Sequence, residues 1–159
     1  MRRLPLLLLP LLLVIATSCS SDSTETTATT ATTTTSTIVE VTGSTGLCDL
    51  PGDVLTCEVE TSDDRVSGIA EIDVSCEFTE NGETTIGDCS GPATYTNEGG
   101  TWEGTCEGTT TWSTSEPAHV HIFDCTYRGT GEYTGLVYRE HIQGTDYPWP
   151  ITGMIEPVQ

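Results

Sequence analysis

The chain has 159 residues, of which 24 are acidic and five are arginine; it has no lysine, and its formal net charge is −19. This charge argues against nucleic acid or anionic lipid as an electrostatic partner, because binding to either depends on Lys and Arg side chains that meet phosphates. The length allows one folded domain with appendages. With 16 glycines, many threonines and only 18% charged residues, the composition favours strands and turns over helices.

The N-terminus has the pattern of a secretory signal peptide. Arg2 and Arg3 are followed by an apolar run from residue 4 to residue 16. At about 1.5 Å per residue, this run reaches only about 20 Å and falls short of the roughly 30 Å hydrocarbon core of a bilayer. A short positive start before an apolar run of this length predicts a signal peptide over residues 1–18.

The apolar run ends in Ala16-Thr17-Ser18-Cys19. This segment resembles the lipobox of bacterial lipoprotein precursors, in which small residues precede a cysteine. The resemblance implies cleavage before Cys19, acylation of its thiol and new amino group, and attachment to the cell membrane through several acyl chains. The alternative is a secreted protein that is cut nearby and leaves Cys19 as an unmodified thiol. Both interpretations place the protein outside the cytoplasm.

A spacer follows the predicted lipidation site. Fourteen of the eighteen residues from 20 to 37 are Ser or Thr, and none of the others is large and apolar. Such a segment buries too little surface to offset its ordering entropy. We therefore expect residues 19–37 to form a lipidated cysteine with a disordered linker, and residues 38–159 to form a single β domain.

Alternation of apolar and polar residues predicts the strands of this domain. From Val66 to Phe78, every second residue is apolar or glycine, which is the period of a half-buried strand. Further strands are expected over 102–112, 119–128, 132–143 and 149–155. Many short strands at regular spacing, with no helical periodicity, predict a small antiparallel β-barrel, with a β-sandwich as the alternative.

Two hairpin turns are indicated by glycine pairs. Asn81-Gly82 provides residues that tolerate a positive φ, and Gly99-Gly100 provides a second turn. A symmetric register about the second turn pairs Tyr95 with Gly104.

Six cysteines remain once Cys19 is set aside, and an even number in an exported domain predicts a disulfide framework. A fold about the Ser115–Glu116 peptide places Cys106 opposite Cys125, within bridging distance. Sequential pairing is therefore preferred for the set Cys48, Cys57, Cys76, Cys89, Cys106 and Cys125. Cys76 and Cys89 are expected to lie diagonally across the Asn81-Gly82 hairpin, and Cys48 and Cys57 flank a turn signal at residues 50–52. The sequence contains no Cys-x-x-Cys pair, so zinc binding is a weaker explanation of these cysteines.

A glycine-rich segment near the C-terminus, Gly129-x-Gly131-x-Tyr133-x-Gly135-Leu136, resembles a strand motif of small secreted β-barrels of the allene oxide cyclase and dirigent type, and of uncharacterised bacterial relatives. The resemblance covers about the last third of the chain. It implies a barrel architecture and carries over no catalytic residue.

The histidines are candidate metal ligands. His119-Val120-His121 on a strand would place two imidazoles on one face, about 7 Å apart. A metal site would need a third ligand from a neighbouring strand, which His141 or Glu140 could provide.

The aromatic side chains are candidate ligand contacts, with a purely structural core as the simpler interpretation. The set is Trp102, Trp112, Tyr133, Tyr138 and Trp149. No nucleophile motif is present, so we assign no catalytic residue and no cofactor. The sequence favours a lipid-anchored binding or structural module of the cell envelope, whose partner is a small molecule, a glycan or an envelope protein. The alternative is an envelope enzyme or a metal-binding protein that uses His119, His121 and His141.

Overall fold

The computed structural model describes residues 37–49, 54–114 and 119–159. The chain divides into two units, and the described residues belong to the second, residues 34–159. The predicted signal peptide, Cys19 and the linker up to residue 36 lie outside the described residues. So do the turn at residues 50–52 and the centre of the loop at 115–118.

The described chain is all-β. Its strands are β1 (Val39–Asp49), β2 (Leu55–Thr61), β3 (Gly68–Ile72), β4 (Ser75–Asn81), β5 (Thr84–Asn97), β6 (Gly100–Ser113), β7 (His119–Gly129), β8 (Leu136–Gly144) and β9 (Pro150–Pro157). Two short 3-10 helices, η1 (Asp64–Val66) and η2 (Gly131–Tyr133), connect β2 to β3 and β7 to β8. Among the described residues, no helix is long and apolar enough to span a membrane.

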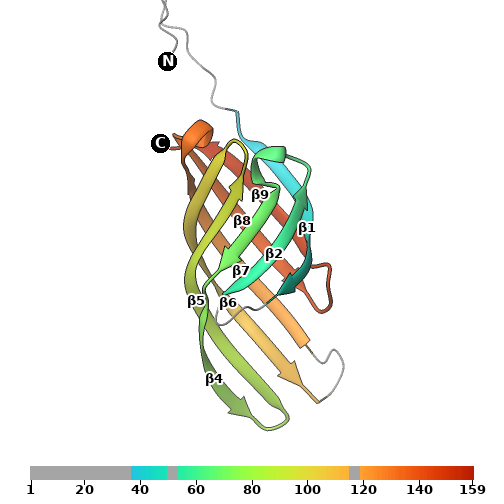
Figure 1. Ribbon diagram of the computed structural model, residues 1–159. Helices are drawn as coiled ribbons and strands as arrows, with labels where there is room; N and C mark the ends of the chain where they lie inside the picture. The colour runs from blue at the N-terminus through green and yellow to red at the C-terminus, as the bar shows by residue number, and fades with distance from the viewer. Residues whose placement is uncertain (1–36, 50–53, 115–118) are drawn as a thin grey trace, which may run out of the picture. The chain divides into compact units, whose positions relative to one another are not determined.

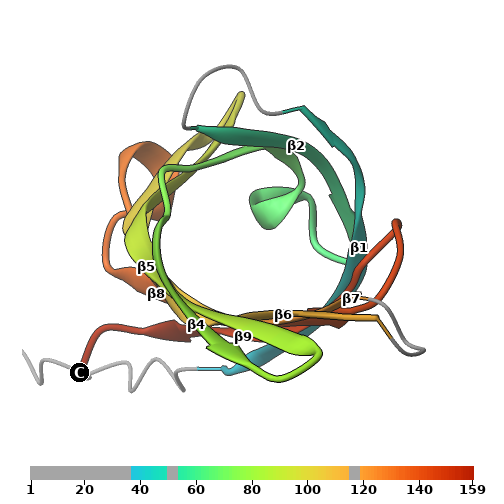
Figure 2. The ribbon, with the colours of Figure 1, turned by 90° about the horizontal axis from the view of Figure 1, so that it is seen from below.

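The sheet closes into an antiparallel barrel, as the alternation predicts. The strand order is β3-β2-β1-β9-β8-β7-β6-β5, and β3 pairs with β5 to complete the ring of eight strands (Figures 1 and 2). β4 continues past β3 and pairs with the other half of β5, outside the ring. The segment expected as one strand over 66–78 is thus broken at Asp73-Val74, where the amide of Asp73 donates to the carbonyl of Pro92.

The two ends of the barrel differ. One end carries η1, η2, the start of β1 and the end of β9, and we call it the plugged end (Figure 1). The other carries the β4–β5 hairpin, the end of β6, the start of β7 and the turn at 145–149, and we call it the open end. β5 and β6 have 14 residues each, against seven in β2 and five in β3, so one wall projects beyond the ring at the open end.

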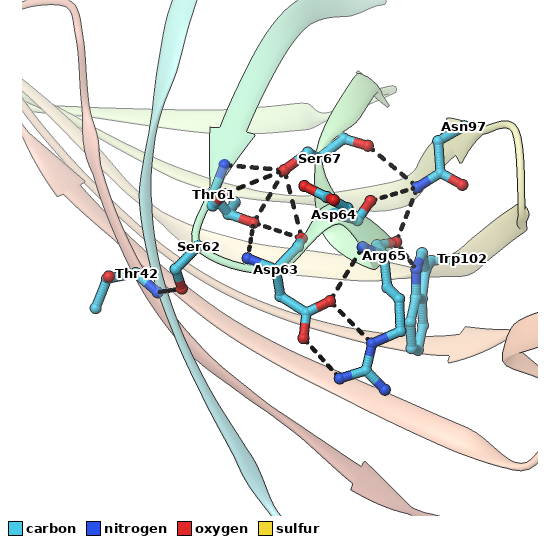
Figure 3. Close-up of polar contacts among 9 residues, drawn as sticks. All are labelled: Thr42, Thr61, Ser62, Asp63, Asp64, Arg65, Ser67, Asn97 and Trp102. Carbon is cyan, nitrogen blue, oxygen red and sulfur yellow. Dashed lines mark hydrogen bonds and ion pairs between the residues drawn. The ribbon is translucent and has the colours of Figure 1, made fainter.

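Residues 61–67 fold into the plugged end. Seen along the barrel, η1 lies inside the ring of strands (Figure 2). Asn97 Nδ2 donates to the carbonyls of Asp64, Arg65 and Ser67, and Trp102 Nε1 donates to that of Arg65 at 2.6 Å (Figure 3). Val66 is fully buried as a result. Polar contacts therefore fix a segment whose composition alone would indicate an ordinary surface loop.

A charged pair lies within this plug. Arg65 donates through Nε and Nη2 to the two carboxylate oxygens of Asp63, at 2.8 and 2.6 Å. The hydrogen bonds from Arg65 lower the pKa of Asp63 and keep it ionised.

All three predicted disulfides are present, with the sequential pairing. Cys48–Cys57, Cys76–Cys89 and Cys106–Cys125 each join directly opposed residues of neighbouring strands, at Cα separations of 4.0 to 4.2 Å. The diagonal arrangement expected for the second bridge is wrong. Gly82 and Glu83, rather than Asn81 and Gly82, form the turn, and this shift of one residue places Cys76 opposite Cys89.

The predicted pairing of Tyr95 with Gly104 is also wrong, because Tyr95 pairs with Trp102. The turn consists of Glu98 and Gly99, one residue earlier than expected. Asn97 fixes it there, since its Oδ1 accepts from the amide of Gly99 and from the hydroxyl of Tyr133. A Cβ added to Gly99 would collide with the ring and hydroxyl of Tyr133, so this glycine makes room for that ring at the plugged end.

Candidate ligand-binding site

A pocket of about 440 Å³ occupies the open end of the barrel. Side chains that face the barrel interior and side chains of the turn at 145–149 line it. Its apolar wall consists of Leu55, Val74, Trp112, Phe123, Tyr147, Trp149 and the Cys76–Cys89 disulfide. Its polar groups are Thr110, His119, His121, Thr145 and Asp146.

The strand register explains why these side chains converge. Trp112 pairs with His119, Thr110 with His121, and all four share the interior face of β6 and β7. Phe123 follows two residues after His121 on that face. Since β6 and β7 extend past the ring, their inner face is covered only in part, and the pocket lies against it.

His121 forms the polar floor of this pocket. Its Nδ1 lies 2.7 Å from Thr110 Oγ1, and its ring packs on Trp149 with the centroids 4.6 Å apart. Burial lowers the pKa of His121 below its ordinary value, and the neighbouring His119 lowers it further. The imidazole is therefore neutral at pH 7.

Trp149 contacts two other rings, because Tyr147 also stacks on it, with a centroid separation of 4.4 Å. Its backbone is fixed to β1, where its amide donates to Thr45 Oγ1 and its carbonyl accepts from the amide of Thr45. The indole Nε1 is buried and has no hydrogen-bond partner among the described residues. Such an unpaired buried donor is uncommon in folded proteins.

The aromatic residues singled out from the sequence fall into two groups. Trp112 and Trp149 line the pocket at the open end. Trp102, Tyr133 and Tyr138 lie in the core towards the plugged end, where Trp102 stacks on Tyr133 at 5.1 Å and also contacts Tyr138. Only the first group is in a position to touch a ligand.

The three histidines are not brought together. His119 and His121 face the pocket, as expected for a strand, whereas His141 lies on the outer face of β8. There its Nδ1 is 2.8 Å from the Asp124 carboxylate, and both side chains are exposed. In the part of the chain that the structure describes, no group of three or more His, Cys, Asp or Glu side chains is arranged to hold a metal ion.

Glu140, considered from the sequence only as a third metal ligand, has another environment. It is 3% exposed in the middle of the barrel, where its carboxylate accepts hydrogen bonds from Tyr95 at 2.6 Å and from Tyr127 at 3.1 Å. Burial raises its pKa to about 7, against the opposing effect of these hydrogen bonds. Burial and the nearby carboxylate raise the pKa of both tyrosines well above the ordinary value.

The alternation of β8 carries the signal that identifies Glu140. Tyr138, Glu140 and Ile142 share one face, and two of the three are large and apolar. A carboxylate on a core face needs hydrogen-bond donors, and interior-facing tyrosines provide them here. Tyr95, Tyr127 and Tyr138 belong with the Cys106–Cys125 bridge to the buried core, and none of these residues lines the pocket.

No protein-family model matches the sequence, and no curated protein or solved structure is significantly similar to it. The candidate site therefore depends on the geometry of this chain alone.

Proposed function

We propose that this protein is a lipid-anchored extracytoplasmic binding module that takes a small, largely apolar ligand into the pocket at the open end. The observation that carries the proposal is the contrast between the two halves of the barrel. The plugged half is filled by aromatic rings and sealed by residues 61–67, whereas the open half presents a concave apolar wall. Small-molecule sites are typically such apolar concavities with a few polar groups.

The site is also built rather than incidental. Three sets of contacts hold the pocket wall in place. They are the Cys76–Cys89 bridge, the contact of Thr110 with His121, and the contacts of the Trp149 ring with His121 and Tyr147. Walls held in this way lose little conformational entropy when a ligand binds. His119 and His121 enter this proposal as polar groups of the wall.

The three disulfides suggest an extracytoplasmic protein, because such bonds persist in oxidising compartments. The lipobox-like segment further supports attachment of the protein to the cell membrane through acylated Cys19. The described chain begins at the plugged end, whereas the elements that line the pocket lie at the open end (Figure 1). The Gly129–Leu136 motif that resembles dirigent-type barrels lies around η2, away from the pocket, and the proposal takes no residue role from it.

The ligand site is tested with N-phenyl-1-naphthylamine, a neutral dye that fluoresces in apolar surroundings. The mature protein is expected to bind it with an enhanced, saturable signal under direct excitation of the dye. Trp112→Ala is expected to weaken binding by about tenfold, because it removes the largest ring at the rim of the pocket.

The matched control is Met154→Ala, which removes a large, 40% exposed side chain from β9 outside the pocket and should leave dye binding unchanged. Near-ultraviolet circular dichroism checks that both variants are folded. Absence of saturable dye binding, or equal losses in the two variants, would contradict the proposal.

A further inference from the structure

We propose that the pocket at the open end selects an apolar ligand that carries a positive charge, such as an arylammonium or alkylammonium group. This inference rests on the proposed function and adds the chemical class of the ligand. Its basis is the charge and ring content of the pocket wall.

Lysine and arginine side chains are absent from this wall, and its two basic side chains are His119 and His121. The chain has no lysine, and the three arginines among the described residues lie elsewhere. Arg65 pairs with Asp63 in the plug, Arg139 pairs with Glu156 at 2.9 Å on the outer face, and Arg128 lies near the plugged end of β7. An anionic ligand would therefore find no lysine or arginine counter-ion in the pocket.

The pocket also has an acidic side chain at its rim. Asp146, on the turn at 145–149, lines the rim. His121 adds no opposing charge at neutral pH, since burial keeps it neutral. The net charge of the whole chain, −19, adds a negative potential that favours the arrival of cations.

The rings provide the second attraction. Trp112, Phe123, Tyr147 and Trp149 all line the same pocket, and Trp149 is stacked with Tyr147. The face of an aromatic ring attracts a cation, most strongly for Trp, and several rings around one site form the arrangement that recognises ammonium groups.

The test compares three compounds of nearly the same size and shape, each as a competitor of N-phenyl-1-naphthylamine bound to the mature protein. These are phenyltrimethylammonium, neutral tert-butylbenzene and anionic benzenesulfonate. We expect phenyltrimethylammonium to bind at least about tenfold more tightly than tert-butylbenzene, and benzenesulfonate to compete least.

Two variants that change the net charge of the protein equally separate the effect of the carboxylate at the pocket from the effect of the overall charge. Asp146→Asn should weaken phenyltrimethylammonium binding by about fivefold and leave tert-butylbenzene binding unchanged. Asp124→Asn, which makes the same change in net charge on the outer face, should change either affinity by less than about twofold.

The outcomes distinguish this inference from the proposed function. If tert-butylbenzene or benzenesulfonate competes as well as phenyltrimethylammonium, or if the two Asn variants behave alike, the charge selectivity is refuted while the pocket remains a binding site. If the dye itself does not bind, the site is refuted and the inference with it.

Discussion

The buried Glu140 makes the free energy of unfolding depend on pH. Its carboxyl group is surrounded by tyrosine rings, and its pKa of about 7 in the folded protein lies above the ordinary value of 4.5. The folded state thus binds this proton more tightly than the unfolded chain does. The resulting stabilisation is complete below pH 4.5 and is lost as the pH rises towards 7.

Glu140→Gln is expected to abolish this dependence, because the amide keeps a hydrogen-bond acceptor for Tyr95 and does not ionise. Between pH 4.5 and 7, the free energy of unfolding should fall by about 3 kcal/mol more in the wild type than in the variant. Urea denaturation at a series of pH values measures the difference. The control is the exposed Glu71→Gln, which should follow the wild type; parallel curves for all three proteins would refute the assignment.

Asn97 is the residue on which the plug depends most. Its amide donates to three carbonyls of the η1 segment, and its Oδ1 accepts from Gly99 and Tyr133. Asn97→Ala leaves several of these groups unpaired in a half-buried site, so we expect a loss of about 2 kcal/mol of stability. Asn81→Ala, at an exposed strand end, should cost much less. Equal unfolding midpoints for the two variants would contradict this role.

At the scale of elements, the extension formed by β4, β5, β6 and β7 is what makes the pocket. β4 lies at the edge of the sheet and pairs with β5, and the Cys76–Cys89 bridge fastens it there. The ring of eight strands closes through β3 and β5 without β4. A substitution that destabilises the extension can therefore leave the ring of eight strands folded.

Replacement of Cys76 and Cys89 together by Ala is expected to lower the free energy of unfolding by about 3 kcal/mol, since the bridge closes a loop of 13 residues. The barrel should remain folded, because the other two bridges and the core at the plugged end are retained. Binding of N-phenyl-1-naphthylamine should weaken more than fivefold, since this disulfide lines the pocket. Unchanged dye affinity in the double variant would show that the extension does not shape the site.

The registers of the two hairpins could not be predicted from the sequence. Alternation identifies which residues of a strand share a face, and it correctly predicts the interior positions of Cys106, Cys125 and Trp112. It does not fix which two residues form a tight turn. At residues 97–100, that choice depends on the hydroxyl of Tyr133, 36 residues away, which binds Asn97.

At the scale of the whole molecule, the barrel and its disulfides follow from the sequence, but the division into a filled and an open half does not. Trp102 and Trp112 lie on the same face of β6 and are equivalent in the alternation. Trp102 is buried because residues 61–67 cover the plugged end. In this segment only Val66 belongs to an apolar alternation, and that alternation predicts a strand where the 3-10 helix η1 forms. His119 and His121 could be placed on one face from their spacing, whereas the barrel wall separates them from His141.

If the open end binds a ligand while the plugged end does not, the three tryptophan side chains should respond differently to that ligand. Each gives one indole N–H signal in a nitrogen-15 correlation spectrum of the mature protein. On titration with phenyltrimethylammonium, the signals of Trp112 and Trp149 should shift in a saturable way, while that of Trp102, bonded to the Arg65 carbonyl inside the plug, should stay in place. A shift of the Trp102 signal alone, or of none of the three with either this compound or N-phenyl-1-naphthylamine, would contradict the account.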